Sequence, residues 1–230
     1  MISMPNLVGS GAMSVAGINI TVPITAVIPQ FATLLVSVGC STGNTIELSF
    51  TDNKGNIYYC DVVGQRNASL WTGVGHAFIT NLLVPGDAVT VNFGTSFANT
   101  KIVQILMVTG LAPNGTETVG IYTATAAAIT QTYSMSTTVV GSLYVGAHYW
   151  STSTPGYTPL DNTFATPVTV GGSSNSLVTD YYIASTVGPH LLGGTSGGSV
   201  NQSLRGAVFN PITAAMIGAD TMSGVQSITT

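Results

Sequence analysis

Residues 89–93 read Val-Thr-Val-Asn-Phe, with apolar side chains at every second position and polar side chains between them. Successive side chains of an extended strand point to opposite faces, so this alternation indicates a strand with one buried and one exposed face. The same period of two recurs in residues 18–22 and 46–50. Half-buried strands of this kind are typical of antiparallel sheets.

The strands on either side of these segments are more uniformly apolar. Residues 34–38, 102–108 and 143–149 contain few polar side chains, as expected of central strands that are covered on both faces. Asp52-Asn-Lys-Gly-Asn56 and Pro85-Gly-Asp87 lie between apolar runs. Because Gly and Asn tolerate the positive φ of tight turns, we read the first as a hairpin turn. The pattern predicts an all-β chain with almost no helix.

Charged residues are unusually scarce. The chain of 230 residues has four Lys and Arg and eight Asp and Glu, and residues 1–46 and 118–160 contain none of these. So few bases exclude binding of nucleic acid through its phosphates, and they exclude attraction to an anionic membrane. No apolar run reaches the roughly 18 residues that a membrane-spanning helix needs. A surface without charges predicts contact with neighbouring molecules in a larger structure rather than a solitary enzyme.

The two ends differ from the middle of the chain. Residues 1–16 and 212–230 are small, neutral and weakly patterned, so we expect an N-terminal and a C-terminal arm around a single domain of residues 17–211. A weak internal similarity links residues 35–39 with 143–147, and residues 101–113 with 203–211. Two related half-sheets would explain this similarity, and chance resemblance between apolar strands would explain it equally well.

The sequence offers no convincing catalytic or metal-binding constellation. Ser196 lies in Gly-Thr-Ser-Gly-Gly (194–198), which fits the G-x-S-x-G pattern of hydrolases. That motif requires a strand before the serine and a helix after it, and no helical pattern follows here, so we read an exposed Gly/Ser loop. His76, His148 and His190 lack the spacing of metal ligands. We predict no enzyme activity, no catalytic residue, no metal and no cofactor.

Two aromatic residues are candidates for a surface site. Trp150 and Tyr157 flank the Ser/Thr/Pro-rich loop 151–156, where they could stack on sugars or form an interface. Packing in the core is the competing interpretation for each of them. Cys40 and Cys60 each end an apolar run, and either a disulfide or two buried free thiols would fit that placement.

The order of these segments resembles a known group of proteins. The apolar strand 34–38 is followed by a D-x-x-G-N-x-Y turn at 52–58, an aromatic-containing strand, and a Gly-Asp-x-Val-Thr-Val strand at 86–91. This order is similar to that of jelly-roll-like β-sandwich modules of bacteriophage virion proteins (capsid decoration and tail) and of bacterial surface proteins, over about residues 31–211. The resemblance implies an antiparallel two-sheet β-sandwich of jelly-roll type, and it brings no catalytic residues.

We therefore expect a non-enzymatic structural protein of a bacteriophage virion. The most direct expectation is a capsid decoration or auxiliary protein, exposed on the particle surface as an oligomer and in contact with other virion proteins and copies of itself. The alternative is a carbohydrate- or receptor-binding module of a phage tail or of a bacterial cell surface, with host-surface glycans as ligands. We expect neither nucleic acid binding nor membrane insertion.

Overall fold

The computed structural model describes residues 1–66, 69–122, 128–150, 156–159, 168–171 and 175–212. Sixteen β-strands and no helix lie in this part of the chain, which confirms the all-β prediction. Among these residues there is accordingly no helix able to cross a membrane. The strands form four antiparallel sheets, where we had expected two.

The first eight strands form a first unit of two sheets. Inner sheet 1 has the order β1-β8-β3-β6-β5, and outer sheet 1 has the order β2-β7-β4. The strand bounds are β1 (Asn6–Met13), β2 (Gly17–Pro23), β3 (Thr33–Ser41), β4 (Ser49–Asp52), β5 (Tyr58–Arg66), β6 (Leu70–Phe78), β7 (Ala88–Phe97) and β8 (Lys101–Val108).

The remaining strands form a second unit with the same order. Inner sheet 2 is β9-β16-β11-β14-β13 and outer sheet 2 is β10-β15-β12, so adding eight to each strand number of the first unit gives the second. The similar segments 35–39 and 143–147 lie in the equivalent strands β3 and β11. The strand bounds are β9 (Leu111–Tyr122), β10 (Ala128–Thr137), β11 (Leu143–Trp150), β12 (Thr158–Pro159), β13 (Val168–Gly171), β14 (Ser176–Ile183), β15 (Gly188–Val200) and β16 (Gln202–Pro211).

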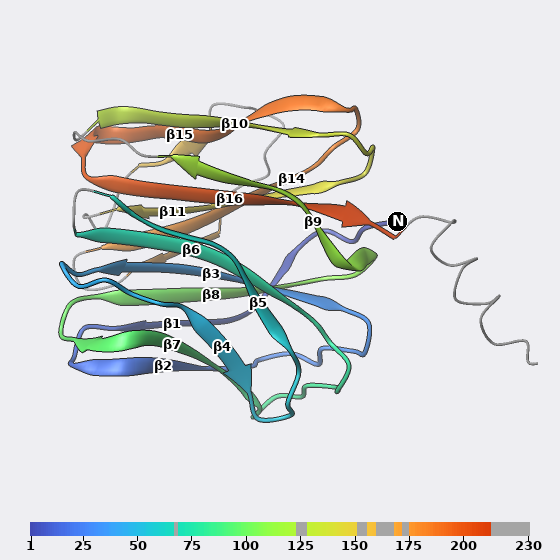
Figure 1. The fold of residues 1–230 in the computed structure, drawn as a ribbon, viewed down its shortest axis with the longest axis horizontal. Coiled ribbons are helices and arrows are strands. Elements are labelled where there is room, and N and C mark those ends of the chain that lie inside the picture. The colour runs from blue at the N-terminus through green and yellow to red at the C-terminus, as the bar shows by residue number, and fades with distance from the viewer. Residues whose placement is uncertain (67–68, 123–127, 151–155, 160–167, 172–174, 213–230) are drawn as a thin grey trace, which may run out of the picture.

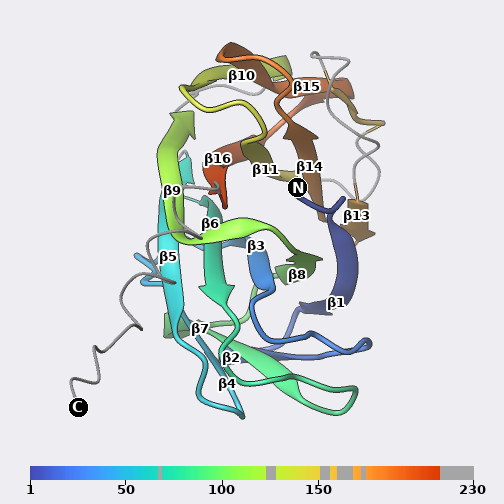
Figure 2. The ribbon, with the colours of Figure 1, turned by 90° about the vertical axis from the view of Figure 1, so that its right-hand side faces the viewer.

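The four sheets are stacked, with the outer sheets at the two extremes and the inner sheets in the middle (Figures 1 and 2). Three hydrophobic clusters fill the three spaces between them. β3 and β11 are buried along almost their whole length because each lies between two other sheets. In β7 the residues Val89, Val91 and Phe93 are buried and those between them are half-exposed, which confirms the predicted alternation.

The two inner sheets meet through reciprocal contacts. Strand β6 contacts β16 while β8 contacts β14, and strand β1 contacts β13 while β5 contacts β9. Since β14 and β16 are the equivalents of β6 and β8, each contact occurs twice with the units exchanged. This is the pattern of a two-fold symmetric interface, here formed within one chain.

Three expectations from the sequence need correction. Residues 1–16 are not a free arm in the chain, because β1 pairs with β8 and Val8 is buried. Residues 193–198 lie in strand β15 rather than in an exposed loop. The turn after Asp52 is not a hairpin between paired strands, since β4 pairs with β7 in the outer sheet and β5 pairs with β6 in the inner sheet. Residues 213–230 of the expected C-terminal arm lie outside the described residues.

Candidate functional site

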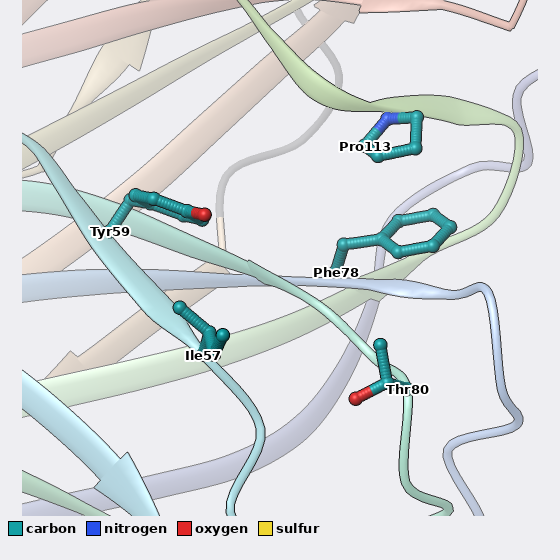
Figure 3. Close-up of a pocket in the computed structure, with 5 residues that line it drawn as sticks. All are labelled: Ile57, Tyr59, Phe78, Thr80 and Pro113. Atoms are coloured by element: carbon teal, nitrogen blue, oxygen red, sulfur yellow. The ribbon is translucent and has the colours of Figure 1, made fainter.

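A shallow apolar cavity lies where the first strand of the second unit passes over the first unit (Figure 3). Its volume is about 160 Å³. Pro113 of β9 lines one side, and the beginning of β5, the end of β6 and the adjoining loops supply the others. No lining residue is charged. We call this cavity the end pocket, and its lining residues are Ile57, Tyr59, Phe78, Thr80 and Pro113.

One wall of the end pocket has a rigid support. The ring of Tyr59 stacks on the ring of His76, with the centroids 5.2 Å apart. His76 is held in turn by Asp61, whose two carboxylate oxygens both lie 2.9 Å from Nδ1, and by the edge of Phe209 at a centroid distance of 5.4 Å. Because the imidazole is fixed on both sides, the Tyr59 ring is already in place before any partner binds, which lowers the entropy cost of binding.

Phe31 extends the apolar surface beside the pocket. Its ring centroid lies 6.1 Å from that of Phe78, and the residue is 66% exposed. Its φ of 68° is a left-handed value, which is a steric outlier for a bulky residue. Hydrogen bonds from Phe31 N–H to Ile79 O and from Ile79 N–H to Ala32 O, both 2.8 Å, hold the loop in this conformation. Strained backbone is concentrated at functional positions, and here it presents an aromatic ring to solvent.

A hydrogen-bond network around Asn56 positions the loops of the pocket. The buried Asn56 side chain accepts at Oδ1 from the N–H groups of Thr80 (2.9 Å) and Asn81 (2.8 Å). Its Nδ2 donates to Asp52 Oδ2 (2.8 Å) and to Asn81 O (3.0 Å). The turn after β4 is thereby tied to the loop after β6, which places Ile57 and Thr80 in one lining.

The predicted surface residue Trp150 lies in the core instead. It is fully buried, because it stands on β11 and points toward the covering outer sheet 2. Its ring stacks on His148 at 5.3 Å and meets the Tyr157 ring at 5.1 Å. Tyr157 is half-buried, and its hydroxyl donates to Asp180 Oδ2 at 2.6 Å. The two residues are thus neighbours, but they form no exposed aromatic site. Residues 151–155 of the intervening loop lie outside the described residues.

The same cluster contains two ionisable groups without an exposed face. His148 Nε2 lies 3.7 Å from Asp180 Oδ1, and both side chains are buried. Burial lowers the pKa of His148 to about 3 and raises the pKa of Asp180 to about 7. Both groups are therefore neutral at mildly acidic pH, because burial disfavours their charged forms. The cluster lies inside the second unit, and the protonation states of its two ionisable groups affect the stability of the fold.

The other residues considered for catalysis do not assemble into a site. Ser196 is almost fully buried within β15, which pairs with β10 and β12, so the strand-to-helix turn of a hydrolase is absent there. His190 packs against Tyr144 and Tyr182. In the described part of the chain, no group of three or more His, Cys, Asp or Glu side chains could hold a metal ion.

Cys40 and Cys60 are both free, so the disulfide interpretation is not met in the structure. Cys40 is buried on β3 between the sheets of the first unit, whereas Cys60 is exposed on the edge strand β5. Strand β6 lies between β3 and β5 and separates the two thiols. Two Cys residues that are a strand apart exceed the Cα separation of a disulfide.

The end pocket was not predicted from the sequence. In the sequence, Tyr59 and Phe78 are recognisable as aromatic residues of strand-like segments. Adjacent residues of a strand point to opposite faces, however, and the pattern does not tell which face is exposed. Phe31 reads as the start of an apolar strand, whereas β3 begins at Thr33. Its position directly after Pro29-Gln30, in a segment flanked by apolar residues, is the only signal of a loop.

Comparison of the chain with protein-family models, with curated proteins and with solved structures found no match. The resemblance to phage virion and bacterial surface modules therefore rests on the sequence motifs quoted above.

Proposed function

We propose that each eight-strand unit is a jelly-roll sandwich, and that the chain is a non-enzymatic structural protein of a virus particle. The observation that carries this proposal is the nested pairing of strands. In the first unit β1 pairs with β8, β2 with β7 and β3 with β6. In the second unit β9 pairs with β16, β10 with β15 and β11 with β14. Rolling up one long antiparallel ribbon gives these three nested pairs, which are typical of jelly rolls, and jelly rolls are common in viral capsid proteins. The innermost pair of such a ribbon, β4 with β5, is not formed, because β4 pairs with β7 and β5 pairs with β6.

The distribution of charge supports an assembly role. Two of the four basic residues are buried: Lys101 Nζ donates to Phe97 O (2.6 Å), and Arg205 Nη1 donates to Leu204 O (2.6 Å). A third, Lys54, pairs with Asp87 at 3.2 Å. The described surface is thus even less charged than the composition implies. A neutral surface packs against neighbours without the cost of removing charges from water.

The end pocket supports the same role from another side. Phe31, Ile57 and Tyr59 are exposed apolar residues gathered at one end of the first unit. Contiguous exposed apolar surface marks interaction sites, and rigid aromatics are the residues that most often dominate them. We propose that the protein acts as a capsid decoration or auxiliary protein, with its end pocket among the contact surfaces.

Two measurements test this proposal. Analytical ultracentrifugation of the purified full chain over a concentration series should give a defined oligomer or a larger closed assembly. Gold-labelled antibody against the chain should mark the outside of virus particles in electron micrographs of a producing culture. A chain that stays monomeric at every concentration, and labels no particle, would overturn the proposal.

The glycan-binding alternative requires a different residue from the one expected. Because Trp150 is buried, Tyr59, the exposed aromatic of the end pocket, takes its place as the candidate for stacking on a sugar. Saturable binding on a glycan array that is lost in Tyr59→Ala would favour a receptor-binding module over an assembly protein.

A further inference from the structure

We propose that the end pocket receives the C-terminal segment, residues 213–230, of a neighbouring copy of the chain. This inference rests on the proposed assembly function and names the partner of the end pocket.

The pocket fits one bulky apolar side chain. A cavity of roughly 150 Å³ with an apolar lining binds a benzene-sized group, and the end pocket has a volume of about 160 Å³. Its lining contains two hydroxyls, those of Tyr59 and Thr80, and no charge. The supported Tyr59 ring and the exposed Phe31 ring adjoin this cavity, which gives a rigid apolar surface larger than the pocket itself.

The C-terminal segment has a composition that suits this surface. Its 18 residues contain a single charged residue, Asp220, and five bulky apolar residues: Met216, Ile217, Met222, Val225 and Ile228. A segment of this length spans up to about 60 Å when extended, at roughly 3.3 Å per residue, so it can reach an adjacent molecule.

The chain leaves β16 in a direction away from the pocket, so docking within the same copy requires the segment to reverse, whereas docking on a neighbouring copy does not. In the antiparallel pair of β16 and β9, Phe209 lies opposite Thr116 and Pro211 lies opposite Leu111. The N–H of Ile212 then donates to Gly110 O at 2.8 Å. Successive residues of β16 thus meet earlier and earlier residues of β9. At Ile212 the chain is moving away from Pro113, the residue of β9 that lines the pocket.

The test uses two variants that each lack one partner of the contact. A chain that ends at residue 212 has the pocket but no segment, and Ile57→Glu keeps the segment but puts a charge into an exposed position of the pocket. Val140→Glu, which adds the same charge at a comparably exposed apolar residue of the second unit, is the matched control. We expect both pocket and segment variants to be monomers, and Val140→Glu to assemble like the natural chain.

Mixing distinguishes exchange between copies from docking within one copy. The Ile57→Glu chain can donate its segment and the shortened chain can accept it, so an equimolar mixture should form one-to-one pairs in ultracentrifugation. A labelled synthetic peptide of residues 213–230 should bind the shortened chain, and its affinity should fall at least about tenfold in the shortened chain that also carries Ile57→Glu. No change in peptide affinity, or no pairs in the mixture, would overturn the proposal.

Failure of this inference can be told from failure of the proposed function. If the natural chain and the shortened chain both assemble, the assembly function stands and the C-terminal contact is wrong. If the natural chain is monomeric but the peptide binds the shortened chain, the segment occupies its own pocket and exchange is wrong. If the natural chain is monomeric and labels no particle, and the peptide does not bind, both proposals fall.

Phe31→Gly separates a docking role from a structural one. Glycine adopts the left-handed backbone without strain, so the variant should keep the stability of the folded chain. It removes the exposed ring beside the pocket, so peptide affinity should fall severalfold. The variant is made in the shortened chain. If it binds the peptide with the same affinity as the unchanged shortened chain, Phe31 is not part of the contact.

Discussion

Gly39 lies at a close approach of the two inner sheets. A Cβ atom at this position would lie 2.3 Å from Cδ2 of Tyr149. The Tyr149 ring is buried and its hydroxyl donates to Thr100 O at 3.3 Å, so the ring has little freedom to move aside. We predict that Gly39→Ala lowers the free energy of unfolding by about 1–3 kcal/mol through overpacking, measured as a lower urea midpoint.

Gly17→Ala is the control for this prediction. The nearest atom to a Cβ on Gly17 is the flexible end of the Met13 side chain, at 3.2 Å. The substitution should therefore change the free energy of unfolding by less than about 0.5 kcal/mol. Similar midpoints for the Gly39→Ala variant and the natural chain would contradict the close packing of the inner sheets.

The buried Asp180 and His148 make opposite pH-dependent contributions to the stability. Burial raises its folded-state pKa to about 7 from an ordinary value of 3.8, so its contribution to stability is fully present below pH 3.8 and is lost as pH rises through 7. Burial lowers the pKa of His148 from 6.5 to about 3, so its contribution is lost in the opposite direction, as pH falls below 6.5. In the natural chain the two effects nearly cancel between about pH 4 and 6.5.

Asp180→Asn should remove this compensation. We predict that the stability of the variant, relative to the natural chain, falls by roughly 1 kcal/mol for each unit by which the pH is lowered from 7 to 4. Urea midpoints of both proteins in the same series of buffers measure this difference, and the contributions of groups remote from Asp180 cancel in it. A difference that does not change with pH would mean that Asp180 is ionised in the folded chain.

The connection between β4 and β5 owes its shape to one side chain. Asn56 makes hydrogen bonds to the backbone of two residues after β6 and to Asp52, all from a buried position. We predict that Asn56→Ala costs about 2–4 kcal/mol of unfolding free energy, because the N–H groups of Thr80 and Asn81 lose the acceptor that ties the turn to the loop after β6. Thermal or urea unfolding measures the loss.

Asn44→Ala provides the comparison for this element. Asn44 is exposed, so its substitution should alter the free energy of unfolding by less than about 0.5 kcal/mol. If Asn56→Ala is no more destabilising than Asn44→Ala, the turn is held by its backbone alone.

The elements were predictable where the pattern of apolar residues was regular. The alternation in β7 and the apolar runs of β3, β8 and β11 gave strands in the right places. β15 was not predicted, because Gly193 and Gly194 indicated a loop. A Cβ on Gly194 would lie 2.3 Å from the Tyr157 ring, so the strand needs glycine where the aromatic cluster packs. This requirement comes from a residue 37 positions away and leaves no local signal.

The candidate site depends on contacts between elements that the sequence does not reveal. Ile57 and Phe78 lie at the same end of the paired strands β5 and β6, and Pro113 joins them only because β9 of the second unit crosses the first unit. Aromatic content indicated Trp150 as the surface residue, yet the outer sheet covers it. Which face of a strand stays exposed depends on the number of layers, and the layers became evident only with the strand order.

At the scale of the whole molecule, the two units with the same strand order pack against each other as the two subunits of a two-fold symmetric dimer would. Its two inner sheets bury each other, so contacts with other molecules must use the outer sheets, the ends of the units and the terminal segments. The weak similarity of residues 35–39 and 143–147 hinted at this repeat. It stayed ambiguous because apolar strands of unrelated origin share the same few residue types.

The scarcity of exposed charge leads to a prediction about assembly of the whole chain. Lys101, Arg205 and Asp180 are buried and Lys54 pairs with Asp87, so few charges remain to attract or repel a neighbour. We predict that the association constant changes less than about twofold between 50 and 500 mM NaCl, although the screening length falls severalfold over this range. Because burial of apolar surface drives the contact, association should weaken on cooling. Sedimentation at the two salt concentrations and at two temperatures measures both effects, and dissociation by added salt would show that charges hold the copies together.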